Sequence, residues 1–454
     1  MSLSFHLPLL FLIFSGTFPI RVPESKKPQS IDSLFSIFVR KYSKSYNSIS
    51  ELHFRKRVFE NEVKKLFGED FDRVMESGSL ENSELVFPVF GRKGFEVKIY
   101  AFADLEDQEF FPQNFKRPKP KQELFENKSP LGSAYNKLVA NGIDPISFAL
   151  QINRGHRPQS ISLLSKGELK AIKSQIFPAE TPNTDRKLQT PSFSKERFLE
   201  NSSRSPDYQG IKANVFEIDG VEYPSSINWS DYLTIAKDQG GCNACYAFAG
   251  LSVLEANYMM SSGRKVDLSE QEVLDCSGRN LGCTGGLAYH VFDYVKRFDL
   301  SFESDYKYVE RKEACKRNEK TKRFRSLLGY HLLKNGVLEI IKALQLGSVA
   351  VAMHAPTAFK YYYKGFFEGE GCPKGQSLPL NHSIHIYGYE LKARRPYFLA
   401  KNVWGSGWGD EGRFKIGIGP LEKSNLGYCH IADTETNVIP IIDRNRESPV
   451  GDDE

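Results

Sequence analysis

The chain has 454 residues, of which 40% are hydrophobic and 26% are charged, and this is the composition of a globular protein. Its length exceeds that of a typical single domain, so we expect two ordered units and a connector. The net charge of +5 is spread along the sequence rather than gathered in blocks, which argues against a nucleic-acid or membrane partner.

A short apolar run at residues 7–14 opens the chain and is followed by the small residues Ser15, Gly16 and Thr17. The run is too short to span a bilayer and is typical of a secretory signal, although no Lys or Arg precedes it. The alternative is a buried N-terminal segment. Because the cysteine usage also indicates an oxidising compartment, we expect residues 1–17 to be a signal peptide.

Residues 34–66 have the spacing of two amphipathic helices. Phe35, Phe38 and Tyr42 lie on one face of the first helix, and Ser48 with Glu51 predicts a capping box that opens the second. Taken alone, such a pair of helices is usually just core.

Residues 111–221 combine two kinds of sequence. The clusters at 116–120 (KRPKP) and 180–184 (ETPNT) predict an exposed, protease-sensitive connector. Between them, Ser165 and Glu168 form a predicted capping box before Leu169, Ile172 and Ile176, so at least one helix is expected. We interpret this stretch as a partly ordered insertion.

Residues 238–248 (DQGGCNACYAF) place a turn rich in small residues directly before a helix-like run, which Gly263 is expected to end. Cys245 would then lie at the N-terminus of a helix. Free N–H groups and the helix dipole favour a thiolate at that position. The sequence therefore indicates a nucleophilic cysteine.

Three interpretations of the pair Cys242 and Cys245 compete: a redox pair, half of a zinc site, or one structural cysteine beside one catalytic cysteine. A redox pair needs a small βαβ domain, and a four-cysteine zinc site needs a second closely spaced pair, but the other cysteines lie at 276, 283, 315, 372 and 429. The third interpretation gains support because His382 follows Cys245 by 137 residues and Asn402 comes later.

From about residue 224 to 440 the chain resembles the papain-like cysteine proteases of the cathepsin group. Five motifs carry the resemblance in the family's order: residues 239–248, 268–276 (LSEQEVLDC), 282–286 (GCTGG), 381–382 (NH) and 402–409 (NVWGSGWG). The resemblance implies an α+β, papain-like two-lobe fold. A helical lobe would carry Cys245, and a β-barrel-like lobe, of which the alternating residues 413–418 are one strand, would carry His382 and Asn402.

Part of the upstream sequence resembles the inhibitory propeptide of cathepsin-L-like enzymes. Glu51, Arg55 and Phe59 fall at its spacing, and residues 101–104 (AFAD) resemble its later motif, while Glu62, Lys98 and Tyr100 depart from it. The implied domains are a signal peptide (1–17), a mainly helical inhibitory propeptide (29–110), an insertion or linker (111–221), a papain-like peptidase domain (222–440) and a C-terminal tail (441–454).

The resemblance also assigns roles to residues. Cys245 would attack the substrate carbonyl, beside a His382 imidazolium that holds the thiol pKa low. Asn402 would orient the imidazole, and Gln239 with the backbone N–H of Cys245 would form the oxyanion hole. The implied substrate-binding residues are Gly285, Gly286, Ala288, Ala352, Leu380, Ser383, Trp404 and Thr434.

Six cysteines remain once Cys245 is set aside, and their spacing alone allows 15 connectivities. The family's pattern implies the pairs Cys242–Cys283, Cys276–Cys315 and Cys372–Cys429. His385 lies three residues after His382, but no second ligand is placed to complete a metal site. We expect no metal and no cofactor.

The expected function is that of a cysteine endopeptidase made as a zymogen. A dipeptidyl peptidase like cathepsin C, whose relatives have a tyrosine at the position of Tyr246, and a catalytically silent binding protein are the alternatives. Expected partners are protein or peptide substrates, the chain's own propeptide as inhibitor and cystatin-like inhibitors, with the protein itself monomeric. The location would be the secretory pathway, either a lysosome-like acidic compartment or outside the cell, and sequons at Asn127, Asn201 and Asn228 would then be open to glycosylation.

Overall fold

The computed structural model describes residues 30–68, 71, 85–88, 96–101, 103–105, 129–153, 156–175, 215–218, 221–372, 379–421, 425–432, 436–444, 446 and 448. The expected signal peptide, the two connector clusters, Asn127, Asn201 and Thr434 lie outside these residues. The chain divides into two compact units: residues 1–90 with 98–106, and residues 91–97 with 107–454.

The first unit contains the predicted pair of helices, α1 (Ile31–Lys41) and α2 (Ile49–Phe67), together with β1 (Val86–Pro88). Phe35, Phe38 and Phe59 stack at its centre with ring centroids 4.7–5.9 Å apart. The Ser48 side chain accepts the Glu51 N–H, as the capping box predicts. The Glu51 carboxylate, however, accepts from the N–H of Asn47 and not from that of Ser48, so the box is incomplete.

The residues around the AFAD motif tie this unit together. Asp104 is buried, and its carboxylate accepts from Lys44 Nζ at 2.8 Å and from the Tyr46 hydroxyl at 2.9 Å. Arg55 donates to the Asp104 carbonyl oxygen at 3.2 Å. A buried carboxylate is stable only when it is paired in this way, so Asp104 fixes its loop against α2 and the connection between α1 and α2.

The second unit contains a helical lobe, which is made of α9 (Cys245–Ser262), α10 (Glu270–Cys276) and α11 (Ala288–Phe298). Almost every residue of α9 is buried, because the helix is apolar or small on all faces and is enclosed by the other elements. Gly263 ends α9 in the left-handed conformation, as predicted, with φ of 71°.

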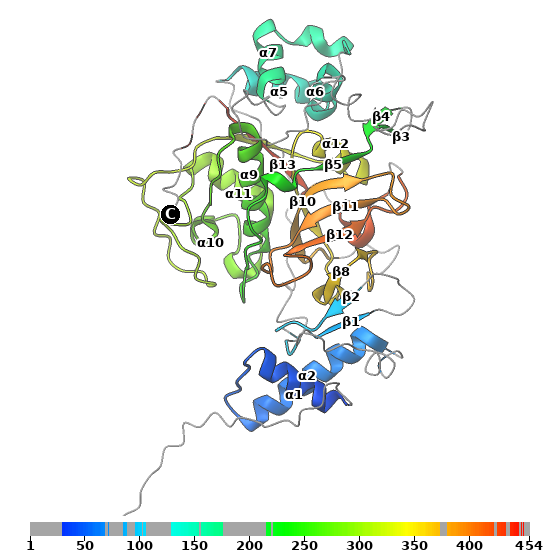
Figure 1. Ribbon diagram of the computed structural model, residues 1–454. Helices are drawn as coiled ribbons and strands as arrows, with labels where there is room; N and C mark the ends of the chain where they lie inside the picture. The colour runs from blue at the N-terminus through cyan, green and yellow to red at the C-terminus, as the bar shows by residue number, and fades with distance from the viewer. Residues whose placement is uncertain are drawn as a thin grey trace, which may run out of the picture. The chain divides into compact units, whose positions relative to one another are not determined.

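An eight-stranded sheet forms the other lobe, with the order β6-β13-β7-β10-β11-β12-β9 and with β5 paired to β10. The central strand β10 pairs antiparallel with β7 and β11, and β10 and β11 lie side by side in Figure 1. Gly388 allows β5 to approach β10, because a side chain there would meet the backbone of Ile227. The strands are β5 (Ser226–Asn228), β6 (Leu327–Leu332), β7 (Val349–Met353), β9 (Phe366–Phe367), β10 (His382–Glu390), β11 (Tyr397–Lys401), β12 (Arg413–Gly417) and β13 (Val438–Ile442).

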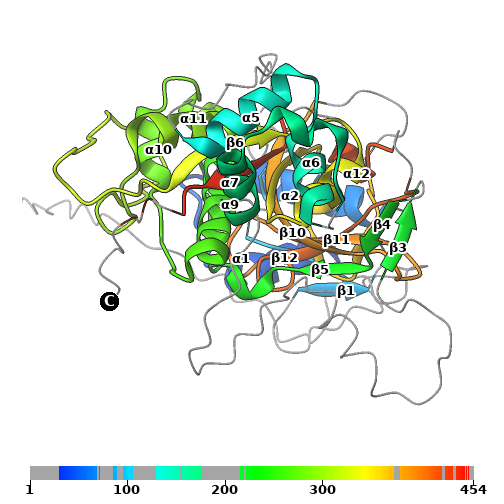
Figure 2. The ribbon, with the colours of Figure 1, turned by 90° about the horizontal axis from the view of Figure 1, so that it is seen from above.

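Smaller elements complete this unit. The short helices are α12 (Val337–Leu344), α13 (Thr357–Lys360), η4 (Ser230–Tyr232), η5 (Gly282–Thr284) and η6 (Tyr428–His430). The strands β3 (Val215–Ile218) and β4 (Val221–Pro224) form a hairpin, visible in Figure 2, that spans the domain boundary expected at residue 222. Glu96 and Val97 of β2 (Glu96–Lys98) pair antiparallel with β8 (Tyr362–Lys364).

The insertion contains more helix than the sequence predicted. It forms α5 (Pro130–Ala140), α6 (Pro145–Asn153), η3 (Gln159–Leu163) and α7 (Lys166–Gln175). The predicted capping box is complete: Glu168 accepts the Ser165 N–H at 2.7 Å, and Ser165 Oγ accepts the Glu168 N–H at 3.3 Å. We call residues 130–175 the helical module.

Candidate active site

Cys245 is the first residue of α9, at the helix N-terminus that the sequence predicted. The disulfide between Cys242 and Cys283 fastens the preceding loop to η5. The structure also contains the disulfides Cys276–Cys315 and Cys372–Cys429, so all three pairs are those that the resemblance implies. Cys245 alone keeps a free thiol, and it is buried.

His382 begins β10, and its Nε2 lies 2.7 Å from Oδ1 of Asn402. The same Oδ1 accepts the N–H of Val403 at 2.9 Å, and only the oxygen of an amide can accept. The amide orientation is therefore fixed, and Nε2 must carry the proton that it donates. Nδ1 is then the nitrogen that does not carry a proton in the neutral ring.

Aromatic side chains cover one side of the hydrogen-bonded pair His382 and Asn402. The Trp404 ring lies 4.6 Å, centroid to centroid, from the His382 ring, and Phe359 lies 5.4 Å from Trp404. Both Trp404 and Phe359 are buried, so water has little access to the His382–Asn402 hydrogen bond from this side. A hydrogen bond in such a place is stronger than one in water.

Gln239 connects the loop before Cys245 to the segment after Asn402. Its backbone N–H donates to the Val403 carbonyl at 2.9 Å, and its own carbonyl accepts from the Tyr308 hydroxyl at 2.7 Å. Its side-chain amide donates one N–H to the Cys242 carbonyl at 2.9 Å. An amide nitrogen has two donors, and the contact with Cys242 uses one of them.

The electrostatics differ from the prediction of a low thiol pKa. Burial raises the pKa of Cys245 to about 11, although N–H groups of Ser383, Tyr246 and Cys245 itself and the Ser383 hydroxyl oppose this. Burial likewise lowers the pKa of His382 to about 4, and the hydrogen bond to Asn402 opposes it. Desolvation penalises the charged form of each group, so burial by itself favours the neutral thiol and the neutral imidazole.

The expected substrate-binding residues lie on several elements. Ser383 on β10 is the cross-strand partner of Ala352 on β7, and the buried Leu380 precedes β10. Ala288 begins α11. Gly286 follows η5 at a place where a Cβ atom would lie 2.8 Å from the Tyr246 ring. Gly285 precedes it with φ of 124°, a conformation that strongly favours glycine.

One contribution was missed at the sequence level. Ser383 was expected only as part of a substrate pocket, yet its hydroxyl and N–H also stabilise the charged form of the Cys245 sulfur. The sequence offered no clear signal for this contribution, because successive side chains of a strand point to opposite faces and Ser383 would be expected to face away from His382.

His385 takes no part in the site. It is fully buried, and its Nδ1 lies 2.8 Å from Oγ of Ser252 on α9. No cluster of three or more potential metal ligands occurs among the residues that the structure describes. Within the same part of the chain, every helix is too short or too polar to cross a bilayer.

Fold and site together define a hydrolase that uses a thiol and an imidazole. The family model of the papain family cysteine proteases matches residues 223–439. The chain is 32% identical over 259 residues to a cathepsin L-like proteinase of Fasciola hepatica, which covers 55% of this chain and 75% of that protein. It is 33% identical over 202 residues to the thiol protease aleurain of Arabidopsis thaliana, covering 43% of this chain and 56% of that protein.

Solved structures agree on the fold. A digestive procathepsin L 3 from the larval midgut of Tenebrio molitor superimposes with a TM-score of 0.54 at 21% identity, covering 90% of this chain and 99% of that one. Procathepsin L2 of the same midgut gives a TM-score of 0.55 at 20% identity, covering 91% and 100%. The chain belongs to the papain family of cysteine proteases. It is a cysteine endopeptidase with the two-lobe fold of the family's precursors.

Proposed function

We propose that Cys245 is the nucleophile of this endopeptidase and that His382 is its acid and base. The thiolate sulfur attacks the carbonyl carbon of the scissile bond, and the proton on His382 Nδ1 passes to the leaving amine. Water then attacks the thioester, His382 accepts its proton, and the sulfur leaves as thiolate. The observation that carries this proposal is the fixed amide of Asn402, which leaves Nδ1 as the ring nitrogen for the exchange.

Gln239 and the backbone N–H of Cys245 are the proposed oxyanion hole. A tetrahedral intermediate needs two donors that already point at the oxygen. The spare N–H of the Gln239 amide and the N–H at the start of α9 supply them, and both belong to a loop that the Cys242–Cys283 disulfide holds rigid.

The full-length chain is proposed to be a latent precursor, with its propeptide (29–110) as inhibitor. Two observations support this. Burial favours the neutral thiol and the neutral imidazole, which disfavours the nucleophilic thiolate. In addition, Glu96 and Val97 of the expected propeptide add an edge strand to β8, a contact that must be broken when the propeptide leaves. Access of water would then move both pKa values toward the ion pair.

For substrates, we propose extended peptides with a medium or large apolar residue two positions before the scissile bond. Ala288, Ala352, Leu380 and Ser383 would line that subsite, with Thr434 as a fifth member outside the described residues. None of them carries a charge, so an Arg side chain would be left unpaired there, which is costly. Proposed inhibitors include cystatin-like proteins, and three disulfides favour the secretory pathway, with its lysosome-like compartments or the exterior as the destination.

A peptide-library digest with the activated enzyme tests these proposals. We expect cleavage at internal bonds with Leu or Phe two positions before the cut. An epoxide thiol reagent should label wild-type protein at Cys245 and leave Cys245→Ala unlabelled. Release of dipeptides alone would indicate the dipeptidyl peptidase, and labelling without any cleavage would indicate a silent binding protein.

A further inference from the structure

The helical module (residues 130–175) has a core of its own that two side chains of the sheet complete. Apolar residues of its helices gather into one buried cluster: Leu131, Ala134, Leu138, Phe148, Ala149, Ile152, Leu164, Ala171 and Ile172. Leu328 of β6 and Ile441 of β13 are partly buried and pack against this cluster. The module and the sheet therefore share apolar surface, which would be exposed to water if they separated.

A polar contact locks the module to β6. His331 lies between two residues of the module: its Nδ1 is 2.5 Å from the Tyr135 hydroxyl, and its Nε2 is 3.2 Å from Oδ1 of Asp144. The other carboxylate oxygen, Oδ2, accepts the N–H of Ser147 at 2.8 Å in the first turn of α6. Nε2–H donates to Asp144 and Nδ1 shares a hydrogen bond with the Tyr135 hydroxyl, so both ring nitrogens are satisfied by the module.

Asp144 is tuned to stay charged in this contact. Burial alone would raise the pKa of its carboxyl, but the hydrogen bond and charge of His331, with the hydrogen bonds from Ser147, hold it well below its usual range. Asp144 therefore stays ionised in mildly acidic solution and continues to accept the hydrogen bond from His331. A buried pair of this kind is costly to break, because separation leaves each partner without the other.

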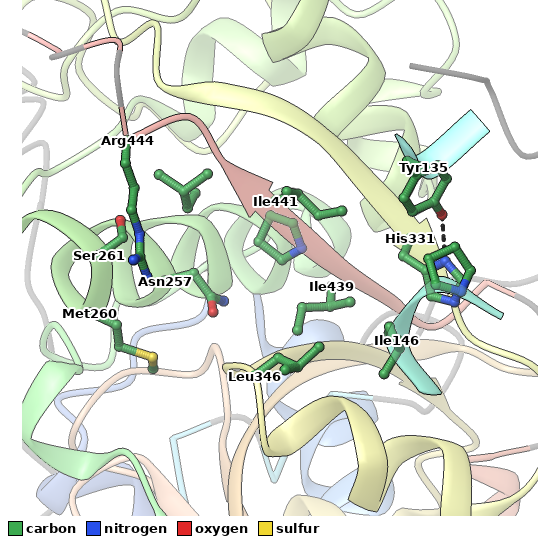
Figure 3. Close-up of a pocket in the computed structure, with 13 residues that line it drawn as sticks. Tyr135, Ile146, Asn257, Met260, Ser261, His331, Leu346, Ile439, Ile441 and Arg444 are labelled. Carbon is green, nitrogen blue, oxygen red and sulfur yellow. Dashed lines mark hydrogen bonds between the residues drawn. The ribbon is translucent and has the colours of Figure 1, made fainter. Parts of the chain in front are cut away.

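The contact between the module and the rest of the unit contains a small cavity. Figure 3 shows the cavity at this interface, with Tyr135 and Ile146 of the module on one side and Asn257 and Met260 of α9 on the other. Its volume of about 40 Å³ leaves room for no more than a few water molecules. The module is thus packed against α9, β6 and β13 and not merely tethered beside them.

The contact between the helical module and the rest of the unit is far from Cys245. Met260 comes fifteen residues after Cys245 on α9, which corresponds to about 22 Å along a helix. The module lies at the C-terminal end of α9, and none of the described residues around Cys245, His382 and Asn402 belongs to it. The module therefore does not cover Cys245, and in this it differs from a domain that blocks one end of a substrate cleft.

We propose that the helical module is an accessory chain of the mature enzyme, one that stays bound to β6 and β13 after the chain is cut on both of its sides. The clusters at 116–120 and 180–184 have the composition of cleavable connectors, and all seven cysteines lie at position 242 or later, so no disulfide holds the module. The shared core and the Tyr135–His331–Asp144 contact hold it instead. In that position it stabilises the sheet that carries β13.

The test uses Cys245→Ala protein cut by a trace of added trypsin, so that it does not depend on the activity proposed above. After cleavage, size-exclusion chromatography followed by mass spectrometry should find the fragment that contains residues 130–175 together with the sheet and helical lobes in equal amounts. A fragment that elutes alone, or is digested away without lowering the melting temperature of the remainder, would overturn the proposal.

Three variants sharpen the result. His331→Ala removes both polar contacts and should raise the dissociation constant of the fragment roughly 10- to 100-fold. Tyr135→Phe removes only the hydroxyl and should raise it roughly 2- to 10-fold, even if His331→Ala fails to fold. His156→Ala is the control, because this exposed histidine of the module uses only its backbone N–H in the structure. If the fragment had the same dissociation constant in all three variants, the proposed role of the Tyr135–His331–Asp144 contact would be refuted.

Discussion

Replacing Asn402 with alanine removes the one side-chain oxygen that His382 Nε2 reaches, at 2.7 Å. Neither the nucleophile nor the base is lost, so the enzyme should be weakened and not silenced. The Trp404 ring stacks close to the imidazole and hinders water from taking the place of the amide. The Nε2–H donor is therefore left without a partner in a buried site.

The expected size follows from this burial. A buried donor without an acceptor costs about 1–3 kcal/mol. If the cost appears in the transition state, kcat/KM falls roughly 5- to 150-fold. The bond to Asn402 also raises the pKa of His382, so its removal lowers that pKa and the protonated imidazole is lost at a lower pH. The alkaline limb of the pH–activity profile should move toward acid.

The assay is kcat/KM on a fluorogenic peptide with Leu two positions before the scissile bond, normalised by titration with an epoxide thiol reagent. Asn257→Ala is the matched control. Asn257 is also a buried amide and donates to the Ser348 carbonyl at 3.0 Å, but it lies near the other end of α9. The control should lose stability and keep its kcat/KM. Unchanged kcat/KM in Asn402→Ala, or a loss as complete as that of Cys245→Ala, would refute this reasoning.

Three further predictions concern the same unit. Alkylation of Cys245 by iodoacetamide should be slow below pH 9 in the uncleaved chain, because burial raises the thiol pKa to about 11. After activation it should be fast near pH 6. Equal pH profiles of alkylation before and after activation would contradict this prediction. Burial lowers the pKa of His382 to about 4 and that of His385 well below its usual value, so the unfolded state binds more protons. Urea titrations of Cys245→Ala at several pH values measure this effect. Below pH ~6.5 the free energy of unfolding should fall by up to about 1.4 kcal/mol per pH unit for each histidine. A free energy of unfolding that does not change with pH would contradict buried neutral rings. Gly286→Ala should lower both activity and melting temperature, because the added Cβ would lie 2.3 Å from Oδ1 of Asn280. Gly407→Ala is the control: its Cβ meets no atom within 4 Å, so the melting temperature should stay within ~2 °C of wild type.

The sequence by itself determined the elements whose signals are local. The turn of small residues before Cys245 and the glycine at 263 were enough to predict the bounds of α9, because a helix start and a left-handed helix end depend on neighbouring residues. The same holds for α2 after Ser48 and for α7 after Ser165. The order of the family's motifs then led to the class of enzyme, which the similarity to known proteins confirms.

Tertiary structure alone decided the protonation states and the place of the module. The thiol pKa depends on how much water reaches Cys245, and burial comes from residues distant in the chain, so a helix N-terminus in the sequence could not reveal that burial opposes the thiolate. The partners of His331 lie 196 residues away at Tyr135 and a similar distance away at Asp144. No periodicity or spacing encodes such a contact, because it exists only once the module's helices and the sheet have each folded and packed together.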